Sequence, residues 1–162
     1  MPGQQLTAMP ERFSHKFRAT ELAVRGGIVA VMTRLRDLQL PEFIAGDVEL
    51  ALAEAVNNVT EHAYRGRTDG MITVSCRLED ERLIVNISDH GDPMPEGELP
   101  EAVEHDLETA RHELPEGGFG WGIIYALASA VRYDRRAQRN TLSIIFDLPA
   151  PGEETAMESP AS

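Results

Sequence analysis

The segment from Glu54 to Tyr64 carries acid and amide side chains at a spacing that suits phosphate chemistry. At about 100° per residue, Glu54, Asn58 and Glu61 lie on one side of a helix. An amide oxygen is a hard ligand that suits Mg²⁺, and a carboxylate can orient a hydroxyl and accept its proton. An ordinary solvent-exposed helix face shows the same pattern, and this segment alone favours that simpler interpretation.

A second candidate segment runs from Asp89 to Pro93, directly after an alternating apolar stretch. A carboxylate at the end of a strand can accept a hydrogen bond from the exocyclic amine of adenine, whereas guanine has a carbonyl there. Gly91 would let the backbone approach a flat ring. A plain turn remains the alternative, because Asp, Gly and Pro all favour turns.

A glycine cluster from Gly117 to Gly122 forms the third candidate segment. Free backbone N–H groups at the start of a helix bind anions, and we expect a helix to follow these glycines. A flexible glycine loop is the alternative. A Rossmann loop fits poorly because it would directly follow a strand. Lys16 is the only lysine and does not follow these glycines, so a P-loop is excluded.

The elements that must position these segments follow from periodicity and turn residues. We predict an α+β two-layer sandwich, with a mixed, mostly antiparallel sheet covered by helices. The expected elements are a strand at Arg12–Arg18, helices from Thr20 to Leu38 and from Pro41 to Tyr64, strands at Ile72–Leu78 and Leu83–Ile87, a helix from Gly122 to Tyr133 and a strand at Thr141–Leu148. Gly26 and Gly27 weaken the first helix or permit a close approach by another chain. Residues 94–117 have the composition of a functional lid.

The ends of the chain and its overall composition limit the possibilities further. Residues 1–10 are expected to form a flexible N-terminus, 11–148 one domain, and 149–162 a disordered tail. With 162 residues and 42% hydrophobic content, the chain can bury a core. Its net charge of −12 argues against direct binding to nucleic acid. Cys76 is the single cysteine, so no disulfide forms within the chain. We see no long apolar run and no signal peptide. These features predict a cytoplasmic protein without a membrane span.

The order of the three segments, taken together, resembles the ATP-binding fold shared by gyrase, Hsp90, sensor histidine kinases and MutL. Within it, the sequence is most similar to the bacterial anti-sigma-factor serine/threonine kinases. Their helix pattern Glu-Ala-x-x-Asn-x-x-x-His-Ala-Tyr matches Glu54 to Tyr64, and their Asp-x-Gly-x-Pro matches Asp89 to Pro93. Their Gly-Gly-x-Gly, followed by an apolar helix ending Val-Arg-Tyr, matches Gly117 to Tyr133. The resemblance covers roughly residues 11 to 148 and makes them a histidine-kinase-like ATP-binding domain.

This resemblance implies ATP and Mg²⁺ as cofactors and assigns a role to each matching residue. It makes Glu54 the catalytic base, Asn58 the Mg²⁺ ligand and Asp89 the adenine-binding carboxylate. The residues expected around the cofactor are Asn58, Asp89, Gly91, Pro93, Gly118, Phe119, Gly120, Trp121, Gly122 and Thr141. It also implies a homodimer that binds a sigma factor or similar regulator and phosphorylates a Ser or Thr of a small anti-anti-sigma (STAS) protein.

A regulatory module that binds ATP without kinase activity is the alternative. It would act by sequestering its partner. Glu116, Ser129 and Ala130 depart from the family pattern and favour this alternative, whereas the intact Glu54–Asn58 pair argues against it. An ATP hydrolase that drives a clamp motion is a weaker candidate, because the chain has none of the extra domains that such machines use.

Overall fold

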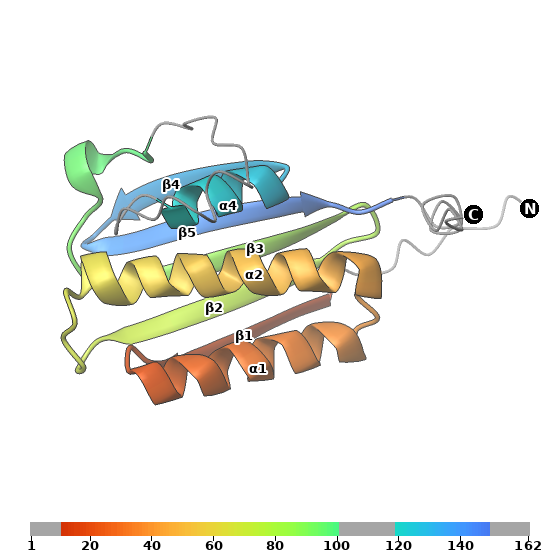
Figure 1. Cartoon of the computed structure of the whole chain (residues 1–162), viewed down its shortest axis with the longest axis horizontal. Coiled ribbons are helices and arrows are strands. Elements are labelled where there is room, and N and C mark those ends of the chain that lie inside the picture. The colour runs from red at the N-terminus through yellow and green to blue at the C-terminus, as the bar shows by residue number, and fades with distance from the viewer. Residues whose placement is uncertain (1–10, 101–118, 150–162) are drawn as a thin grey trace, which may run out of the picture.

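Three helices cover one face of a five-stranded sheet in the computed structural model, which describes residues 11–100 and 119–149 (Figure 1). The sheet has the order β1-β2-β3-β5-β4. Its strands are β1 (Glu11–Arg18), β2 (Met71–Leu78), β3 (Arg82–Asp89), β4 (Ala130–Arg136) and β5 (Arg139–Asp147). The helices are α1 (Glu21–Asp37), α2 (Glu42–Asn58) and α4 (Phe119–Leu127), and a π-helical turn (Val59–Ala63) extends α2. The predicted α+β sandwich is confirmed.

Every strand pair in the described sheet is antiparallel, so the prediction of a mixed sheet is wrong. Tight hairpins join β2 to β3 and β4 to β5, and a hairpin can only pair its strands antiparallel. β1 runs antiparallel to β2, and β5 runs antiparallel to β3. All neighbouring strands of the described sheet therefore run in opposite directions.

The last predicted helix is too long, because its second half is strand β4. α4 ends at Leu127, and the amide of Ser129 donates to the carbonyl of Ile145 at 2.7 Å, which joins the chain to the sheet. From Ala130 onward, half-buried and exposed residues alternate with the period of a strand. The Val131-Arg132-Tyr133 stretch thus places Tyr133 on the helix-covered face of the sheet, opposite Leu142.

The core lies between the helices and the inward side chains of the sheet. Thr20 caps α1 by accepting a hydrogen bond from the amide of Ala23 at 3.2 Å, as its sequence position predicts. The apolar stripe of α2, at Val48, Leu52, Ala55 and Val59, is buried. Cys76 is buried among the inward residues of β2, and this burial raises the pKa of its thiol to about 12, so it acts as a core residue.

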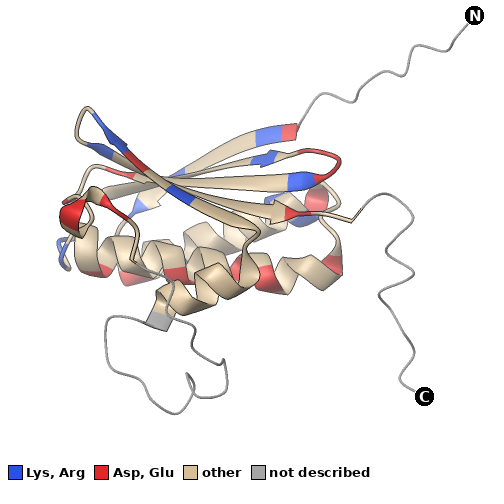
Figure 2. Ribbon diagram, turned by 90° about the horizontal axis from the view of Figure 1, so that it is seen from above, with Lys and Arg blue, Asp and Glu red and all other residues tan. Residues whose placement is uncertain are grey.

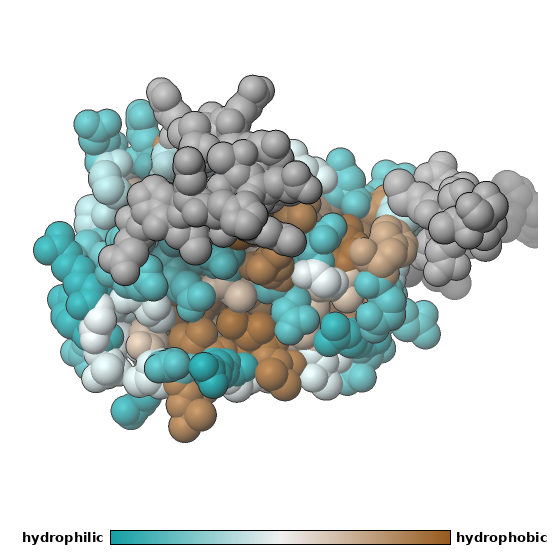
Figure 3. Space-filling model, in the orientation of Figure 1, coloured by the Kyte–Doolittle hydropathy of each residue, from teal (hydrophilic) through white to brown (hydrophobic). Residues whose placement is uncertain are grey.

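The two faces of the molecule differ in charge and in apolar exposure. Basic residues dominate the strands on the uncovered face of the sheet, whereas α2 carries only acidic charges (Figure 2). Apolar surface gathers over α1 and α2, where Leu22, Val29, Phe43 and Leu50 are exposed (Figure 3). No helix in the described ranges is long and apolar enough to cross a membrane. The predicted flexible N-terminus at 1–10, all but the first residue of the predicted tail at 149–162, and most of the predicted lid lie outside the described residues.

Two adjacent glycines in α1 have opposite surroundings, which gives a paired stability prediction. A Cβ at Gly27 would lie 2.5 Å from the ring of Phe17, whereas a Cβ at Gly26 would meet nothing within 4 Å. We expect Gly27→Ala to destabilise the fold by about 1–3 kcal/mol through overpacking. Gly26→Ala should stabilise it by about 0.5–1 kcal/mol, because alanine favours helix.

Urea denaturation of both variants measures the difference. Equal effects at the two positions would contradict the close packing of β1 against α1. They would also contradict the conclusion that Gly27 permits a close contact within this chain.

Candidate functional site

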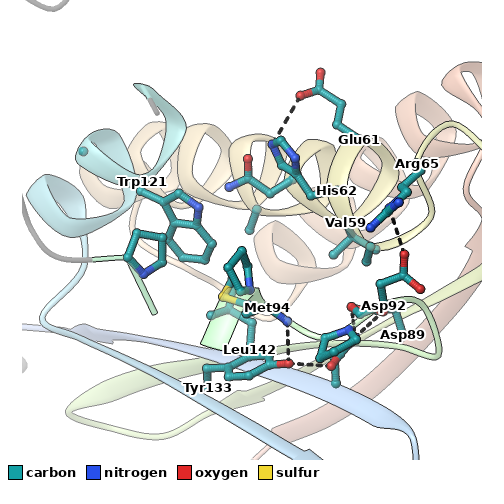
Figure 4. A pocket seen from close by; sticks show the side chains of 18 residues that line it. Val59, Glu61, His62, Arg65, Asp89, Asp92, Met94, Trp121, Tyr133 and Leu142 are labelled. Atoms are coloured by element: carbon teal, nitrogen blue, oxygen red, sulfur yellow. Dashed lines mark hydrogen bonds and ion pairs between the residues drawn. The ribbon is translucent and has the colours of Figure 1, made fainter. Parts of the chain in front are cut away.

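A cavity of about 480 Å³ opens between the end of α2, the start of α4 and the helix-covered face of the sheet. Figure 4 shows Val59 and His62 on its helical wall, Trp121 at the α4 side, and Asp89 and Leu142 on the sheet. Five of the residues expected around a cofactor line it: Asn58, Asp89, Pro93, Trp121 and Gly122. The tertiary structure therefore brings all three sequence segments to one place.

The carboxylate of Asp89 is the polar centre of this cavity. Asp89 is only 4% exposed, and its Oδ1 accepts hydrogen bonds from the amide of Gly91 and from Asn140 Nδ2, both at 2.8 Å. Both bonds fall on one oxygen, and the described residues provide no hydrogen bond to Oδ2. A second acceptor is thus available to a ligand.

Burial raises the pKa of the Asp89 carboxyl, because removal from water disfavours the charged form. The hydrogen bonds from Asn140 and Gly91, and the charge of Arg135, oppose this effect and favour the carboxylate. The site thus holds a poorly hydrated acceptor, which has more to gain from a ligand's N–H group than a carboxylate in water.

Asn140 fixes Asp89 through a network on β4 and β5. Its Nδ2 also donates to the carbonyl of Asp92 at 2.9 Å, so one amide ties β5 to the loop after β3. Its Oδ1 accepts from the Tyr133 hydroxyl at 2.6 Å and from Arg135 Nη1 at 2.8 Å. Asn140 itself is 4% exposed, so these hydrogen bonds lie in a poorly hydrated environment, where each bond is stronger than it would be in water.

The end of α2 packs against the loop that follows Asp89. A Cβ at Gly91 would lie 2.5 Å from the carbonyl oxygen of Ala63, so only glycine permits this approach. The amide of Asp92 donates to the same carbonyl at 2.8 Å, and the amide of His90 donates to the Tyr64 hydroxyl at 3.0 Å. Gly91 therefore holds the helix against the loop, behind the cavity lining.

Glu54 and Asn58 lie at the α4 end of the cavity. A Cβ at Gly120 would lie 2.7 Å from Glu54 Oε2 and 3.6 Å from the amide of Asn58, so Gly120 covers both side chains closely. Asn58 Nδ2 is buried and has no hydrogen-bond partner within the described residues. Burial, and then the charge of Glu61, raise the pKa of the Glu54 carboxyl. Glu54 borders the cavity but, unlike Asn58, does not line it.

Thr141, expected near the cofactor, lies on the opposite face of β5. Its hydroxyl lies 3.3 Å from that of Ser88, on the uncovered side of the sheet, and it does not line the cavity. Its neighbour Asn140 faces the cavity instead. Phe119 begins α4, and Gly118 lies outside the described residues.

Sequence reasoning missed Asn140, Tyr133 and Arg135 as parts of the site. A signal for Asn140 was present, since Leu142, Ile144 and Phe146 alternate inward and the same parity places position 140 inward. Tyr133 could not be found while its segment was interpreted as a helix, and Arg135 follows the predicted end of that helix, where no element was predicted. His62 also lines the cavity.

The fold and site define a nucleotide-binding class of domain: an antiparallel sheet, a helix ending in acid and amide, and a buried strand-end carboxylate. The residues fit ATP with a metal ion. Within the described residues, Asn58 Nδ2 is a buried donor without a partner, which suits a phosphate oxygen, Asp89 Oδ2 accepts no hydrogen bond, and Gly120 approaches closely through its backbone. A cavity of about 480 Å³ lies within the usual size range for small-ligand sites.

The histidine kinase-like ATPase domain family matches residues 17–146, and the chain belongs to this family. It is 28% identical over 99 residues to an anti-sigma F factor of Clostridium beijerinckii, covering 61% of this chain and 67% of that protein. It is 34% identical over 68 residues to the serine-protein kinase RsbW of Listeria innocua. That match covers 42% of this chain and only 36% of the kinase. The similarity to the anti-sigma kinases expected from the motifs is confirmed.

Two solved structures share the fold. The RsbU and RsbW domains of Rv1364c from Mycobacterium tuberculosis align with a TM-score of 0.58 at 20% identity, over 86% of this chain and 34% of that one. A chain of the SiaB–SiaC complex from Pseudomonas aeruginosa aligns with a TM-score of 0.53 at 17% identity, over 84% and 89% of the two chains. At these identities the likeness concerns the fold.

The opposite orientations of Asn140 and Thr141 give a second paired prediction. Asn140→Ala would leave several buried donors and acceptors unpaired, and we expect it to destabilise the fold by about 2–4 kcal/mol. Thr141→Val would remove one 3.3 Å contact on the other face and should cost less than about 1 kcal/mol. Thermal and urea unfolding measure both, and a larger loss from Thr141→Val would contradict the assigned orientations.

Proposed function

We propose that the protein is an ATP-dependent serine/threonine kinase of the anti-sigma type, which binds Mg-ATP in the cavity at Asp89. The observation that carries the proposal is the clamped carboxylate of Asp89, whose Oδ1 is held by two donors while Oδ2 remains for a ligand. An acceptor in that position suits the exocyclic amine of adenine and rejects the carbonyl of guanine. Family membership supports the same ligand.

The acid and amide of the helix would act at the phosphate end. Asn58 would hold Mg²⁺ through its amide oxygen, and Gly118, Gly120 and Gly122 would let backbone N–H groups approach the phosphates. Mg²⁺, when bound, would neutralise charge on the phosphates. Glu54 would orient the hydroxyl of a Ser or Thr substrate and accept its proton, and its raised pKa makes it a stronger base.

We propose as partners a small anti-anti-sigma (STAS) protein as substrate, a sigma factor or similar regulator as the sequestered protein, and a second copy in a homodimer. The names of the Clostridium and Listeria relatives support the first two. The exposed apolar residues on α1 and α2 support a protein contact, since monomeric proteins rarely expose large apolar patches (Figure 3). We place this activity in the cytoplasm.

The kinase-inactive alternative has weaker support from the described residues. Ser129 sits where β4 joins the sheet, and its hydroxyl accepts a hydrogen bond from the amide of Asp147 at 2.8 Å. Neither Ser129 nor Ala130 lines the cavity, so these two departures do not disturb the proposed chemistry. Glu116 lies outside the described residues.

Asp89→Asn tests the adenine contact through the affinity for ATP and the preference for ATP over GTP. Because Gly91 and Asn140 both donate to the inner oxygen, an asparagine would keep its oxygen there and turn its NH₂ group toward the cavity. We expect ATP affinity to fall roughly 10- to 100-fold and the preference for ATP over GTP to shrink or reverse, since guanine offers an acceptor there. Calorimetry with both nucleotides measures this; an unchanged ATP affinity would exclude the adenine role.

Glu54→Gln tests the proposed base. It keeps the shape of the side chain and removes its basicity, so ATP binding should persist within about threefold while phosphotransfer falls at least about 100-fold. In the unmodified protein, phosphotransfer should also decline as pH falls through the raised pKa of Glu54, because the protonated acid cannot accept a proton.

Glu49→Gln is the matched control on the same helix. It removes an equal charge whose ion pair with Arg36 is long, at 3.8 Å, and exposed, so activity should stay near that of the unmodified protein. The assay incubates each protein with Mg-ATP and candidate anti-anti-sigma proteins and detects phosphorylated Ser or Thr by mass spectrometry. Full transfer by Glu54→Gln would refute the catalytic assignment, while intact ATP binding without any transfer would favour the sequestering module.

A further inference from the structure

A second cavity, of about 490 Å³, lies on the uncovered face of the sheet, at the end where β3 finishes. It shares no lining residue with the cavity at Asp89. Its lining includes Lys16, Arg67, Asp69, Thr73, Ser88 and Arg139. They come from β1, β2, β3, β5 and the turn before β2, so only the folded chain assembles them.

The strand register builds the floor of this cavity. Lys16 pairs with Thr73, and Thr73 pairs with Ser88, so an ammonium group and two hydroxyls lie in one row across the sheet. Their neighbours Phe17, Ile72 and Asp89 are buried on the helix side, which turns this row outward. The Ser88 hydroxyl is 3.3 Å from that of Thr141, and it can donate outward while it accepts from Thr141.

Positive charge converges on this floor. Lys16, Arg67 and Arg139 outnumber Asp69, the only carboxylate in the lining formed by the described residues, so the cavity carries two net positive charges in a chain of net charge −12. Arg67 is braced, because its Nε donates to the carbonyl of Tyr64 at 3.0 Å, and its Nη2 lies 3.8 Å from Asp92 Oδ1, so its charge is partly balanced. Within the described ranges, Lys16 and Arg139 form no ion pair.

On the same face of the sheet, three other cations have close acidic partners, while Arg12, Arg18 and Arg132 form no ion pair within the described residues but lie outside the cavity. Arg77 and Arg82 each lie 2.7 Å from Glu79, and Arg136 lies 3.0 Å from Asp134. Cations that converge without a counter-charge repel one another, and an anion among them relieves that cost. The cavity therefore differs from an ordinary solvated basic face by its concavity, its hydroxyl floor and the convergence of Lys16 and Arg139, which form no ion pair within the described residues.

We propose that this cavity binds a phosphate monoester. The planar guanidinium groups of Arg67 and Arg139 suit the oxygens of a phosphate, Lys16 supplies a point charge, and the hydroxyls of Thr73 and Ser88 donate to the remaining oxygens. The volume exceeds what a phosphate group alone fills, so it also holds part of the group that carries the phosphate. The proposal stands whether or not the cavity at Asp89 binds ATP.

The test is an NMR titration of the full chain at constant ionic strength with O-phosphoserine, and with serine as the counterpart that lacks the phosphate. We expect saturable shifts at the backbone amides of Thr73, Ser88 and Gly70 with phosphoserine only. The double variant Lys16→Gln/Arg139→Gln should weaken binding about tenfold or more, because two charge-assisted contacts are lost. The single variants, which change the surface least, should each weaken it severalfold.

Arg12→Gln is the matched control, since Arg12 is an exposed cation on the same face of β1, about 13 Å from Lys16 along the strand, and outside the cavity. It should leave the affinity within about twofold. Equal shifts with serine, shifts confined to Asn58 and Gly120, or unchanged affinity in the Lys16 and Arg139 variants would overturn the proposal. A phosphoserine peptide that binds more tightly than free phosphoserine identifies a protein-borne phosphate, and weaker peptide binding identifies a small phosphorylated molecule.

Discussion

The buried carboxylate of Asp89 imposes the strongest constraint on this structure, because an acid removed from water requires partners. Its inner oxygen accepts from Gly91 and from Asn140, and Asn140 is in turn held by Tyr133 and Arg135. These contacts join β3, β4 and β5 at one end of the sheet. Both hydrogen bonds fall on Asp89 Oδ1, so Oδ2 stays available to a ligand. The arrangement of β3, β5 and β4 and the proposed specificity for adenine therefore depend on the same network.

The helical wall of the site is positioned by the loop that follows this carboxylate. Gly91 and the amide of Asp92 meet the carbonyl of Ala63 in the π-helical turn that extends α2. The same helix carries Glu54 and Asn58, so contact at its end sets the distance between Asp89 and the proposed phosphate side of the cavity. Close packing against backbone leaves little room for adjustment, which gives Gly91 a structural role.

Charge separates the two faces of the sheet. The helical face carries the acidic groups of α2 and the exposed apolar residues of α1, while the uncovered face carries the basic residues that surround the second cavity (Figure 2). Ser88, Asp89 and His90 are consecutive, yet Asp89 belongs to one cavity and its two neighbours to the other. Two separate cavities can therefore lie back to back across one layer of strands.

The sequence alone determined the α+β class, the positions of α1, α2, β2 and β3, and the three motifs around the first cavity. These features are readable because helix and strand periods and turn residues act over a few positions. Only the tertiary structure decided that Val131 to Tyr133 form a strand, that Asn140 faces Asp89 while Thr141 faces away, and that Lys16, Arg67 and Arg139 converge. Those outcomes depend on pairing register between distant segments, which local periodicity does not encode.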